Sequence, residues 1–308
     1  MSTQPTDTPT DVPHERGRWL DPTTGNTVDQ QALMRALAGR QAVLLGERHD
    51  IAEIHRWQLH VTTYLHGLRP NLAVGFEMFP RRLQPVLDRW VAGEYDTATF
   101  IEDSEWHQVW GFDPAIYLPL FHFCRQQRVP MLALNCRRAL VTEVGQQGWE
   151  AIAEADRDGV TPAAPALDAY REYLFSITRG PPTRKATSAH DPAYDRFIRA
   201  QQTWDRAFAC NIANAIRSAE AEGREPPLVV GIIGRGHLEY GYGTPYQLHD
   251  LGIEDVAVLL PNDRETLTIE PHRRIAEAVF RLDTPEPPAE RGERPRPAAN
   301  PDAGTGAG

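Results

Sequence analysis

Two short segments with the same spacing carry the residues best suited to chemistry. Residues 46–49 read Gly-Glu-Arg-His and residues 234–237 read Gly-Arg-Gly-His, and each segment directly follows a run of apolar residues. Such runs are typical of buried strands, so both histidines follow predicted strand ends. The glycines let the backbone turn sharply and approach a ligand closely. We therefore predict a functional site where these two segments meet.

Other polar residues follow the neighbouring predicted strands. Glu47 lies in the first segment, Glu77 follows the apolar run 72–76, and Asn135 follows the run 131–134. In open α/β sheets, ligands bind beyond the carboxyl ends of the strands. We therefore expect both glutamates to converge with the two histidines.

Two carboxylates and two imidazoles allow different kinds of chemistry. Such groups bind a divalent metal ion that activates water, and this alternative assigns His49, His237 and Glu77 as ligands. The same groups also work without metal, with one histidine as general base and a carboxylate orienting it, so the candidate catalytic residues are Glu47, His49, Glu77 and His237. Tyrosines follow His237 in the sequence, and phenolate is a ligand of ferric haem in some proteins. The residues by themselves leave these alternatives open.

The elements that must position these groups indicate the α/β class. Five apolar runs predict strands, at residues 42–46, 72–76, 131–134, 228–233 and 256–260. They are apolar throughout, so we expect a mainly parallel sheet flanked by helices. Helical patterns separate the runs, which favours right-handed βαβ units.

A long helical segment interrupts the strand pattern. Residues 137–222 lack strand signals and predict a smaller all-helical lobe inserted beside the sheet. Late in this segment Gln201, Trp204 and Asp205 are spaced to share one helix face, and this face is a candidate wall of the cleft.

Two further segments have two interpretations each. His55 and Gln58 interrupt the apolar stripe of the helix predicted at residues 51–66. They either satisfy nearby backbone groups or support Glu47 and His49. The aromatic segment 106–112 belongs either to the core or to one wall of a pocket.

Composition excludes several classes of protein. The 308 residues are 41% hydrophobic and carry a net charge of −10, which argues against sequence-independent nucleic-acid binding. No apolar run approaches the length of a membrane span. The three cysteines form no CxxC pair and predict no disulfide framework. We see no signal peptide or lipidation cysteine, which predicts a cytoplasmic protein.

We expect disordered ends at residues 1–16 and 285–308, with one domain at 17–284.

Five ordered segments carry a family resemblance. They read LLGERHDIAEIHRWQL, VGFEMFPRRLQPVLDRWVAGE, WGFDPAIYLPLFHFCRQQRVPMLALN, QTWDRAFACNIANAI and VVGIIGRGHLEYGYGTPYQL. Over residues 19–260 the chain resembles the ChaN-like haem-binding uptake family, which is grouped with the Tiki metalloproteases and the erythromycin esterases.

The resemblance implies an α/β domain with a small helical domain, and haem held between the subunits of a homodimer. The match to GHLEYGYG assigns Tyr240 as ligand of the haem iron and His237 as a second haem-binding residue. The Tiki relatives carry two Gly-x-x-His motifs and a glutamate for metal-dependent hydrolysis. Here both histidine segments match, with Glu77 or Glu47 as the acid. A comparable set works without metal in the esterases.

We therefore predict a haem-binding protein that takes part in haem or iron handling. The alternative is a hydrolase of peptide, ester or lactone bonds that uses the Glu/His cluster. A third interpretation is a carrier of a small molecule without catalysis. In the first two cases we expect the cluster and Tyr240 to share one cleft.

Overall fold

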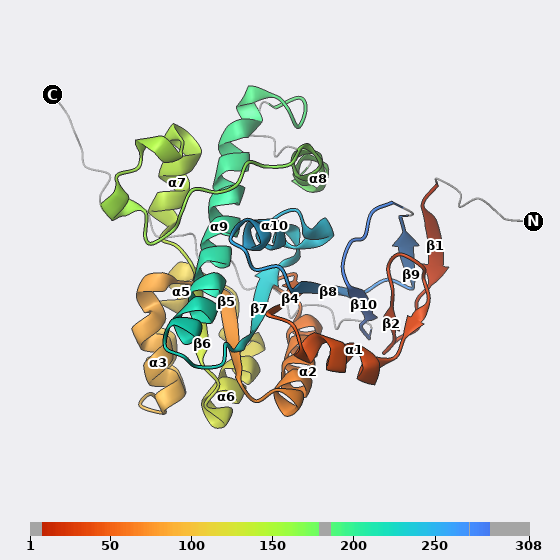
Figure 1. The fold of residues 1–308 in the computed structure, drawn as a ribbon, viewed down its shortest axis with the longest axis horizontal. Helices are drawn as coiled ribbons and strands as arrows, with labels where there is room; N and C mark the ends of the chain where they lie inside the picture. The colour runs from red at the N-terminus through yellow and green to blue at the C-terminus, as the bar shows by residue number, and fades with distance from the viewer. Residues whose placement is uncertain (1–7, 179–185, 271, 284–308) are drawn as a thin grey trace, which may run out of the picture.

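The computed structural model describes residues 8–178, 186–270 and 272–283 of the chain. Its centre is an eight-stranded sheet with the strand order β3-β2-β10-β8-β4-β7-β5-β6 (Figure 1). The strands are β2 Trp19–Leu20, β3 Thr27–Val28, β4 Ala42–Glu47, β5 Leu72–Pro80, β6 Met131–Asn135, β7 Leu228–Gly234, β8 Val256–Asn262 and β10 Ala278–Arg281. A separate two-stranded sheet pairs β1 Thr10–Pro13 with β9 Thr266–Ile269.

The five apolar runs form the parallel centre of this sheet, as predicted. β4 pairs in parallel with β7 and β8, and β5 pairs in parallel with β7 and β6. Strand β7, late in the chain, therefore lies between the early strands β4 and β5. Among the described strands of this sheet, only β2 and β3 pair in antiparallel fashion, at one edge.

Helices cover both faces of the sheet. The α-helices are α1 Gln30–Ala38, α2 Ala52–Leu68, α3 Gln84–Ala92, α4 Thr97–Asp103, α5 Trp106–Val109, α6 Leu118–Gln127, α7 Arg138–Gln147, α8 Asp168–Thr178, α9 Pro192–Ala221 and α10 Thr244–Asp250. Short 3₁₀ helices connect them: η1 Arg81–Leu83, η2 Pro114–Ile116, η3 Trp149–Ala151, η4 Glu154–Asp156, η5 Arg235–His237 and η6 Glu239–Gly241.

Alternation along β4 shows how the two apolar cores form. Val43 and Leu45 enter the core beneath α2 and α6, whereas Ala42 and Leu44 enter the core beneath α9 and α10. Because the strand is buried on both faces, no polar residue interrupts it before its last position. The functional groups of β4 are therefore confined to its carboxyl end.

The segment between β6 and β7 is helical. Residues 137–178 and 186–222 contain helices and no strand. Helices α7 and α8 lie on either side of the upper part of α9 in Figure 1, away from the sheet, while the lower part of α9 packs on β6. One long helix thus connects this region to the sheet edge.

The N-terminal prediction needs a correction. Residues 10–13, predicted to be disordered, form β1 and pair with β9 from Thr10↔Ile269 to Pro13↔Thr266. Of the segments predicted to be disordered, residues 1–7 and 285–308 lie outside the described residues. Within the described ranges, no helix combines the length and apolarity needed to cross a membrane.

Candidate functional site

The carboxyl ends of four neighbouring strands form the site. Glu47 is the last residue of β4 and pairs in register with Gly234, the last residue of β7. Next to them, the pairing of β5 with β6 shifts register between Phe76 and Pro80, the stretch that carries Glu77. The parallel sheet therefore brings together residues from distant parts of the sequence, as predicted.

Glu47 and His49 form the first carboxylate–imidazole pair. Glu47 is 1% exposed, and its Oε1 lies 2.8 Å from Nδ1 of His49. The Tyr117 hydroxyl donates to the same oxygen at 2.8 Å, and Gln58 Nε2 donates to Oε2 at 3.2 Å. Burial alone would raise the pKa of Glu47, but the hydrogen bond with His49 and the nearby His55 lower it below its usual value.

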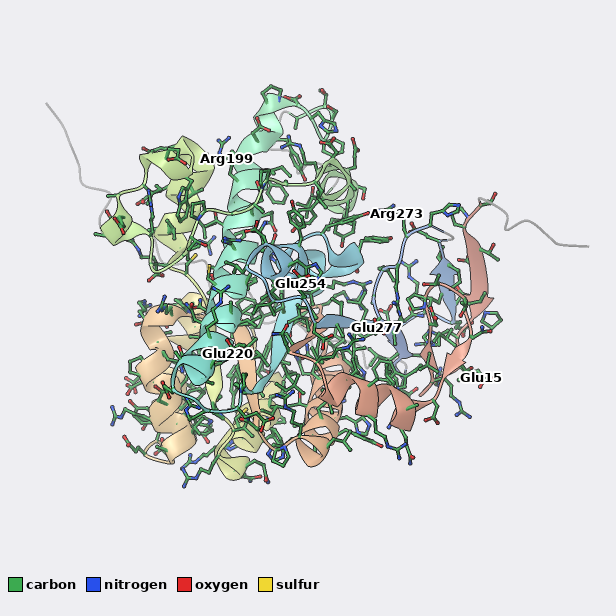
Figure 2. The ribbon with its side chains drawn as sticks, in the orientation of Figure 1. Glu15, Arg199, Glu220, Glu254, Arg273 and Glu277 are labelled. Atoms are coloured by element: carbon green, nitrogen blue, oxygen red, sulfur yellow. The ribbon has the colours of Figure 1, made fainter. Side chains whose placement is uncertain are left out.

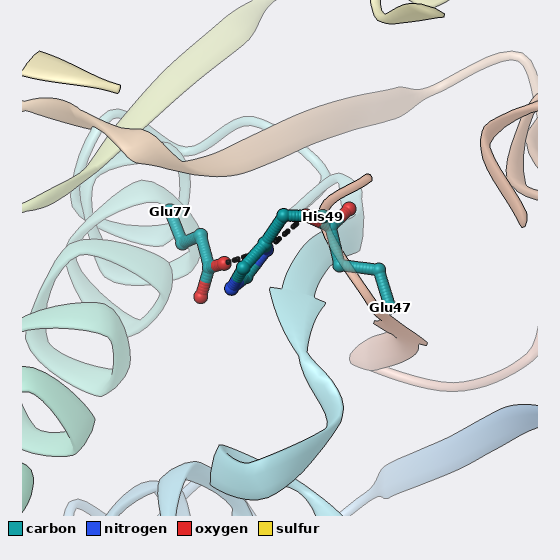
Figure 3. A group of neighbouring side chains, drawn as sticks. All are labelled: Glu47, His49 and Glu77. Atoms are coloured by element: carbon teal, nitrogen blue, oxygen red, sulfur yellow. Dashed lines mark hydrogen bonds and ion pairs between the residues drawn. The ribbon is translucent and has the colours of Figure 1, made fainter. Parts of the chain in front are cut away.

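His49 lies between two carboxylates, as Figure 3 shows. Its Nδ1 is 3.3 Å from Oε1 of Glu77 in addition to the contact with Glu47. Burial would lower the pKa of His49, but the two carboxylates outweigh it and raise the pKa to about 9. The imidazole is therefore positively charged at neutral pH in this arrangement.

Glu77 has one satisfied oxygen and one that lacks a hydrogen bond. The backbone N–H of Gly234 donates to Oε2 at 2.9 Å, whereas the buried Oε1 has no hydrogen-bond partner among the described residues. Burial, together with the charge of Glu47, raises the pKa of Glu77 above its usual value. An unsatisfied buried oxygen beside a cavity is a position where a metal ion or a ligand donor would bind.

His237 forms a second pair, with a partner from the helical insertion. Its Nδ1 lies 2.8 Å from Oδ1 of Asp205, whose other oxygen accepts from the Tyr170 hydroxyl at 2.8 Å. Burial would lower the pKa of His237, but the negative charge of Asp205 raises it. Since Asp205 occupies Nδ1, Nε2 is the nitrogen left for a ligand.

The closest potential metal ligands differ in part from the predicted set. Ligand atoms of Glu47, His49 and Glu77 lie within 4.8 Å of one another, so these residues could hold a metal ion. His237, predicted as a ligand beside His49 and Glu77, is not in this group, and its Nδ1 is bonded to Asp205.

His49 and His237 still share two hollows. A cavity of about 470 Å³ is lined by both histidines, by Glu77 and by the aromatic rings of Trp110, Trp204 and Phe208. A second cavity, of about 410 Å³, touches both histidines from the side of Glu47. The Glu/His cluster is therefore accessible from two sides.

The two segments that had two interpretations each, His55 with Gln58 and the aromatic segment 106–112, both lie next to the cluster. Gln58 Nε2 donates both to Glu47 and to the Leu45 carbonyl, each at 3.2 Å, and His55 Nε2 lies 3.3 Å from the carbonyl of His49. The two residues therefore satisfy backbone groups and also support the cluster. In the aromatic segment Trp106 is fully buried in the core, whereas Trp110 lines the cavity and packs edge-on against His49. Both interpretations of that segment are thus correct in part.

Helix α9 contributes as expected, and one contact was missed. Trp204 lines the main cavity and Asp205 binds His237, while Gln201 lines a neighbouring groove. Tyr117 was not predicted as a site residue, because a tyrosine at a helix start carries no sign that its hydroxyl reaches a strand end. Its signal in the sequence is its place directly before α6, shortly after the aromatic segment.

Tyr240 lies outside both cavities, contrary to the expectation of one shared cleft. Its backbone adopts a left-handed conformation, with φ of 60°, and its hydroxyl donates to Oε1 of Glu270 at 2.6 Å. The guanidinium of Arg273, labelled in Figure 2, lies 4.2 Å from the ring centroid. Burial and Glu270 raise the pKa of this half-buried phenol. The reversed backbone explains why it separates from His237.

A family model described as haem-binding uptake, Tiki superfamily, ChaN matches residues 33–248. The chain belongs to this family. The match to the ChaN family includes the Glu/His cluster and Tyr240, whereas Glu270 and Arg273 lie beyond its end. A comparison with curated proteins finds no match.

One solved structure supports the α/β fold, and a second is less similar. The structure titled cofacial heme binding to ChaN of Campylobacter jejuni is 16% identical, with a TM-score of 0.65, and the match covers 87% of this chain and 98% of that one. A mutant of the erythromycin esterase EreC in its open conformation is 12% identical, with a TM-score of 0.44, and covers 79% of this chain and 76% of its own. At these identities the likeness of the first shows the fold.

Proposed function

We propose that this ChaN family protein binds haem, with Tyr240 as the ligand of the iron, and acts in haem or iron handling. The observation that carries the proposal is the half-buried Tyr240 phenol within the family match, held in a left-handed turn at η6. The ChaN structure from Campylobacter jejuni is described as binding haem cofacially, which supports haem as the bound group here.

The neighbours of Tyr240 act on its proton in opposite directions. Tyrosine binds ferric haem as the phenolate, so its proton must leave. The Arg273 cation above the ring favours a negatively charged oxygen, whereas the hydrogen bond to Glu270 raises the pKa of the phenol, so haem binding requires the hydroxyl to leave Glu270. Tyr242 stacks on Tyr240, with ring centroids 5.5 Å apart, and adds aromatic surface for a porphyrin. When bound, the haem would supply a redox-active iron, carried as cofactor or cargo.

His237 has a different place in the proposal. It was predicted as a second haem-binding residue, but its Nδ1 is bonded to Asp205 and its ring lines the cavities of the cluster. In this proposal Tyr240 is the residue that binds the iron, and His237 belongs to the Glu/His cluster. We also propose a homodimer, since the family resemblance implies haem held between two subunits.

Hemin titration tests this proposal. Addition of hemin to the purified protein should give a shifted Soret band that saturates at a fixed ratio, and Tyr240→Phe should abolish the shift. Tyr242→Phe is the matched control, because it removes a neighbouring hydroxyl and keeps the stacked ring. The proposal would be refuted if micromolar hemin gave no Soret shift, or if Tyr240→Phe gave the same shift as the unmodified protein. Light scattering with and without hemin tests the dimer.

A second candidate function uses the Glu/His cluster as a hydrolytic site. The buried Oε1 of Glu77 favours it, because this oxygen makes no hydrogen bond among the described residues, although Nδ1 of His49 lies 3.3 Å away, and it is therefore available to a metal ion or a ligand donor. Glu47, His49 and Glu77 would hold a divalent cation once the His49 ring has released its proton, and the cation would polarise a carbonyl group or activate water. Nε2 of His237 would then donate or accept a proton in the cavity. Without metal, the two carboxylate–imidazole pairs could act as general acid and base.

Metal content and turnover test this candidate separately from haem binding. After incubation with Zn²⁺ and desalting, elemental analysis should find about one ion per chain in the protein and none in His49→Ala. An esterase and peptidase panel should show activity that His49→Ala and His237→Ala both remove. Activity that persists in both variants would rule out this site.

A further inference from the structure

The cavity over Glu77 continues into a groove between α7 and α9. Arg138 and Trp204 line both the cavity of about 470 Å³ and a neighbouring hollow of about 890 Å³. The groove is otherwise lined largely by small and apolar residues, including Val141, Gly145, Phe197 and Ala200. We call the two connected hollows the α7–α9 cleft. The residues that line the cleft suit a ligand with a polar group at Glu77 and an apolar body beyond it.

Positive charge gathers along this cleft although the whole chain carries a net charge of −10. Four arginines line it, namely Arg82, Arg137, Arg138 and Arg196, against two acids, Glu77 and Glu105. Local charge of the opposite sign to that of the whole protein favours an acidic ligand at this position.

Two of the four arginines are already neutralised. Arg82 Nη1 binds Glu105 at 2.6 Å, and Arg137 Nη2 lies 3.3 Å from a carboxylate oxygen of Asp156. These pairs keep the two guanidinium groups at the rim of the cleft. They also leave the remaining two arginines as the ones that would meet a ligand.

Arg138 is placed at the junction of cavity and groove. Arg138 and Arg196 are both exposed to solvent, and neither side chain has a hydrogen-bond or ion-pair partner in the ranges that the structure describes. Arg138 is also the first residue of α7, a helix of ten residues whose N-terminus has no side-chain cap. The positive end of the helix dipole and the guanidinium therefore act at the same place.

Glu77 supplies an independent sign of a ligand at the other end. Glu77 lines the same cavity, and its buried Oε1, which lies 3.3 Å from Nδ1 of His49, makes no hydrogen bond among the described residues. An oxygen in that state is satisfied when a ligand donates to it. The ligand therefore needs a donor as well as an anionic group.

We propose that the α7–α9 cleft binds a small molecule that places a carboxylate or phosphate group against Arg138 and a hydrogen-bond donor against Glu77. Trp110, Trp204 and Phe208 would pack on its apolar body. The proposal goes beyond haem binding at Tyr240 and does not depend on it. It defines the class of ligand that the Glu/His cluster would meet, whether or not the cluster is hydrolytic.

Calorimetry with a series of small probes tests this inference. N-acetyl-L-phenylalanine, which has a carboxylate, an amide N–H and a ring, should bind about tenfold more tightly than its uncharged carboxamide. Arg138→Gln should remove this preference, whereas Arg35→Gln, at an exposed arginine on α1, should keep it. Equal binding of acid and carboxamide, or a preference that survives Arg138→Gln, would overturn the proposal.

Two further probes resolve the ligand chemistry. N-acetyl-N-methyl-L-phenylalanine lacks the donor and should bind about fivefold more weakly than the parent acid, a difference that Glu77→Ala should abolish; equal binding of the two acids would refute the Glu77 contact. Phenyl phosphate is compared with N-acetyl-L-phenylalanine, and the probe that binds more tightly identifies whether the cleft prefers a phosphate or a carboxylate group. Tyr240→Phe should bind every probe as the unmodified protein does, so a failure of haem binding leaves this test intact. Loss of probe binding in Tyr240→Phe would contradict an independent cleft.

Discussion

Oδ1 of Asp205 lies 2.8 Å from Nδ1 of His237, although the two residues come from the helical insertion and from the end of β7. Asp205 is fully buried and also accepts from Tyr170 and Thr244. The arrangement repeats that of Glu47 with His49 on the neighbouring strand. The site thus contains two carboxylate–imidazole pairs from different layers of the fold, and Glu77 interacts electrostatically with both histidines.

Asp205→Asn should lower the pKa of His237. The carboxylate raises this pKa against the effect of burial, and an amide of the same shape removes the charge. NMR titration of the histidine ring protons, with His237→Gln to assign the signal, measures the change. Tyr170→Phe, which removes a hydrogen bond to Asp205 and keeps its charge, should shift the pKa less. An unchanged His237 pKa in Asp205→Asn would contradict the assigned role of this pair.

The contribution of His49 to stability should depend on pH in one direction. Its pKa is raised to about 9 in the folded protein, above a value of about 6.5 in the unfolded chain. The protonated ring therefore stabilises the fold fully below about pH 6.5, and this contribution is lost as the pH rises through about 9. Urea unfolding in EDTA should show the largest difference in unfolding free energy between the unmodified protein and His49→Gln at pH 6. The difference should shrink by pH 10, and a constant or growing difference would speak against the ion pairs.

Gly234→Ala should disturb the cluster directly. A Cβ at this position would lie 3.0 Å from Cε1 of His49 and 3.3 Å from Oε1 of Glu77. Either side chain must shift, so we expect a loss of about 1–3 kcal/mol in unfolding free energy. Gly67→Ala in α2 is the control, since nothing lies within 4 Å of its Cβ and alanine is favoured in a helix. Thermal unfolding should separate the two, and equal stability would mean that the site relaxes freely.

Tyr117→Phe should destabilise the fold by about 2 kcal/mol, because Glu47 loses a hydrogen bond while buried. The Trp110 indole N–H, which donates to the same hydroxyl at 3.1 Å, also loses its partner. Chemical unfolding measures the change. Tyr64→Phe serves as the comparison and should be nearly neutral, because its hydroxyl makes no hydrogen bond within the described residues. Similar losses in both variants would show that the Tyr117 contact is not special.

The strongest sequence signals came from strands that are buried on both faces. The run at residues 42–46 predicts β4 because only apolar residues fit between two helical layers. The two-residue strands Trp19–Leu20 and Thr27–Val28 are too short to show any periodicity. They form through pairing with other strands, since β2 pairs with β10 and β3 pairs with β2.

The site was predictable where strand ends determine it. Glu47 and Glu77 follow from the strand pattern, whereas the hydrogen bond of Tyr117 depends on how a helix packs on the sheet. Tyr240 was expected beside the cluster because it lies three residues after His237. Its left-handed backbone, which a non-glycine residue seldom adopts, turns the side chain towards Glu270 instead.

The position of β7 between β4 and β5 has a consequence for how the protein matures on the ribosome. Glu47 and Glu77 are synthesised only 30 residues apart, yet the strands that carry them are separated by a slot that residues 228–234 must fill. The nascent chain therefore exposes two unpaired inner strand edges while about 150 further residues emerge, a state prone to aggregation. The cluster is completed only when that late strand inserts, so its formation reports on the last long-range step of folding.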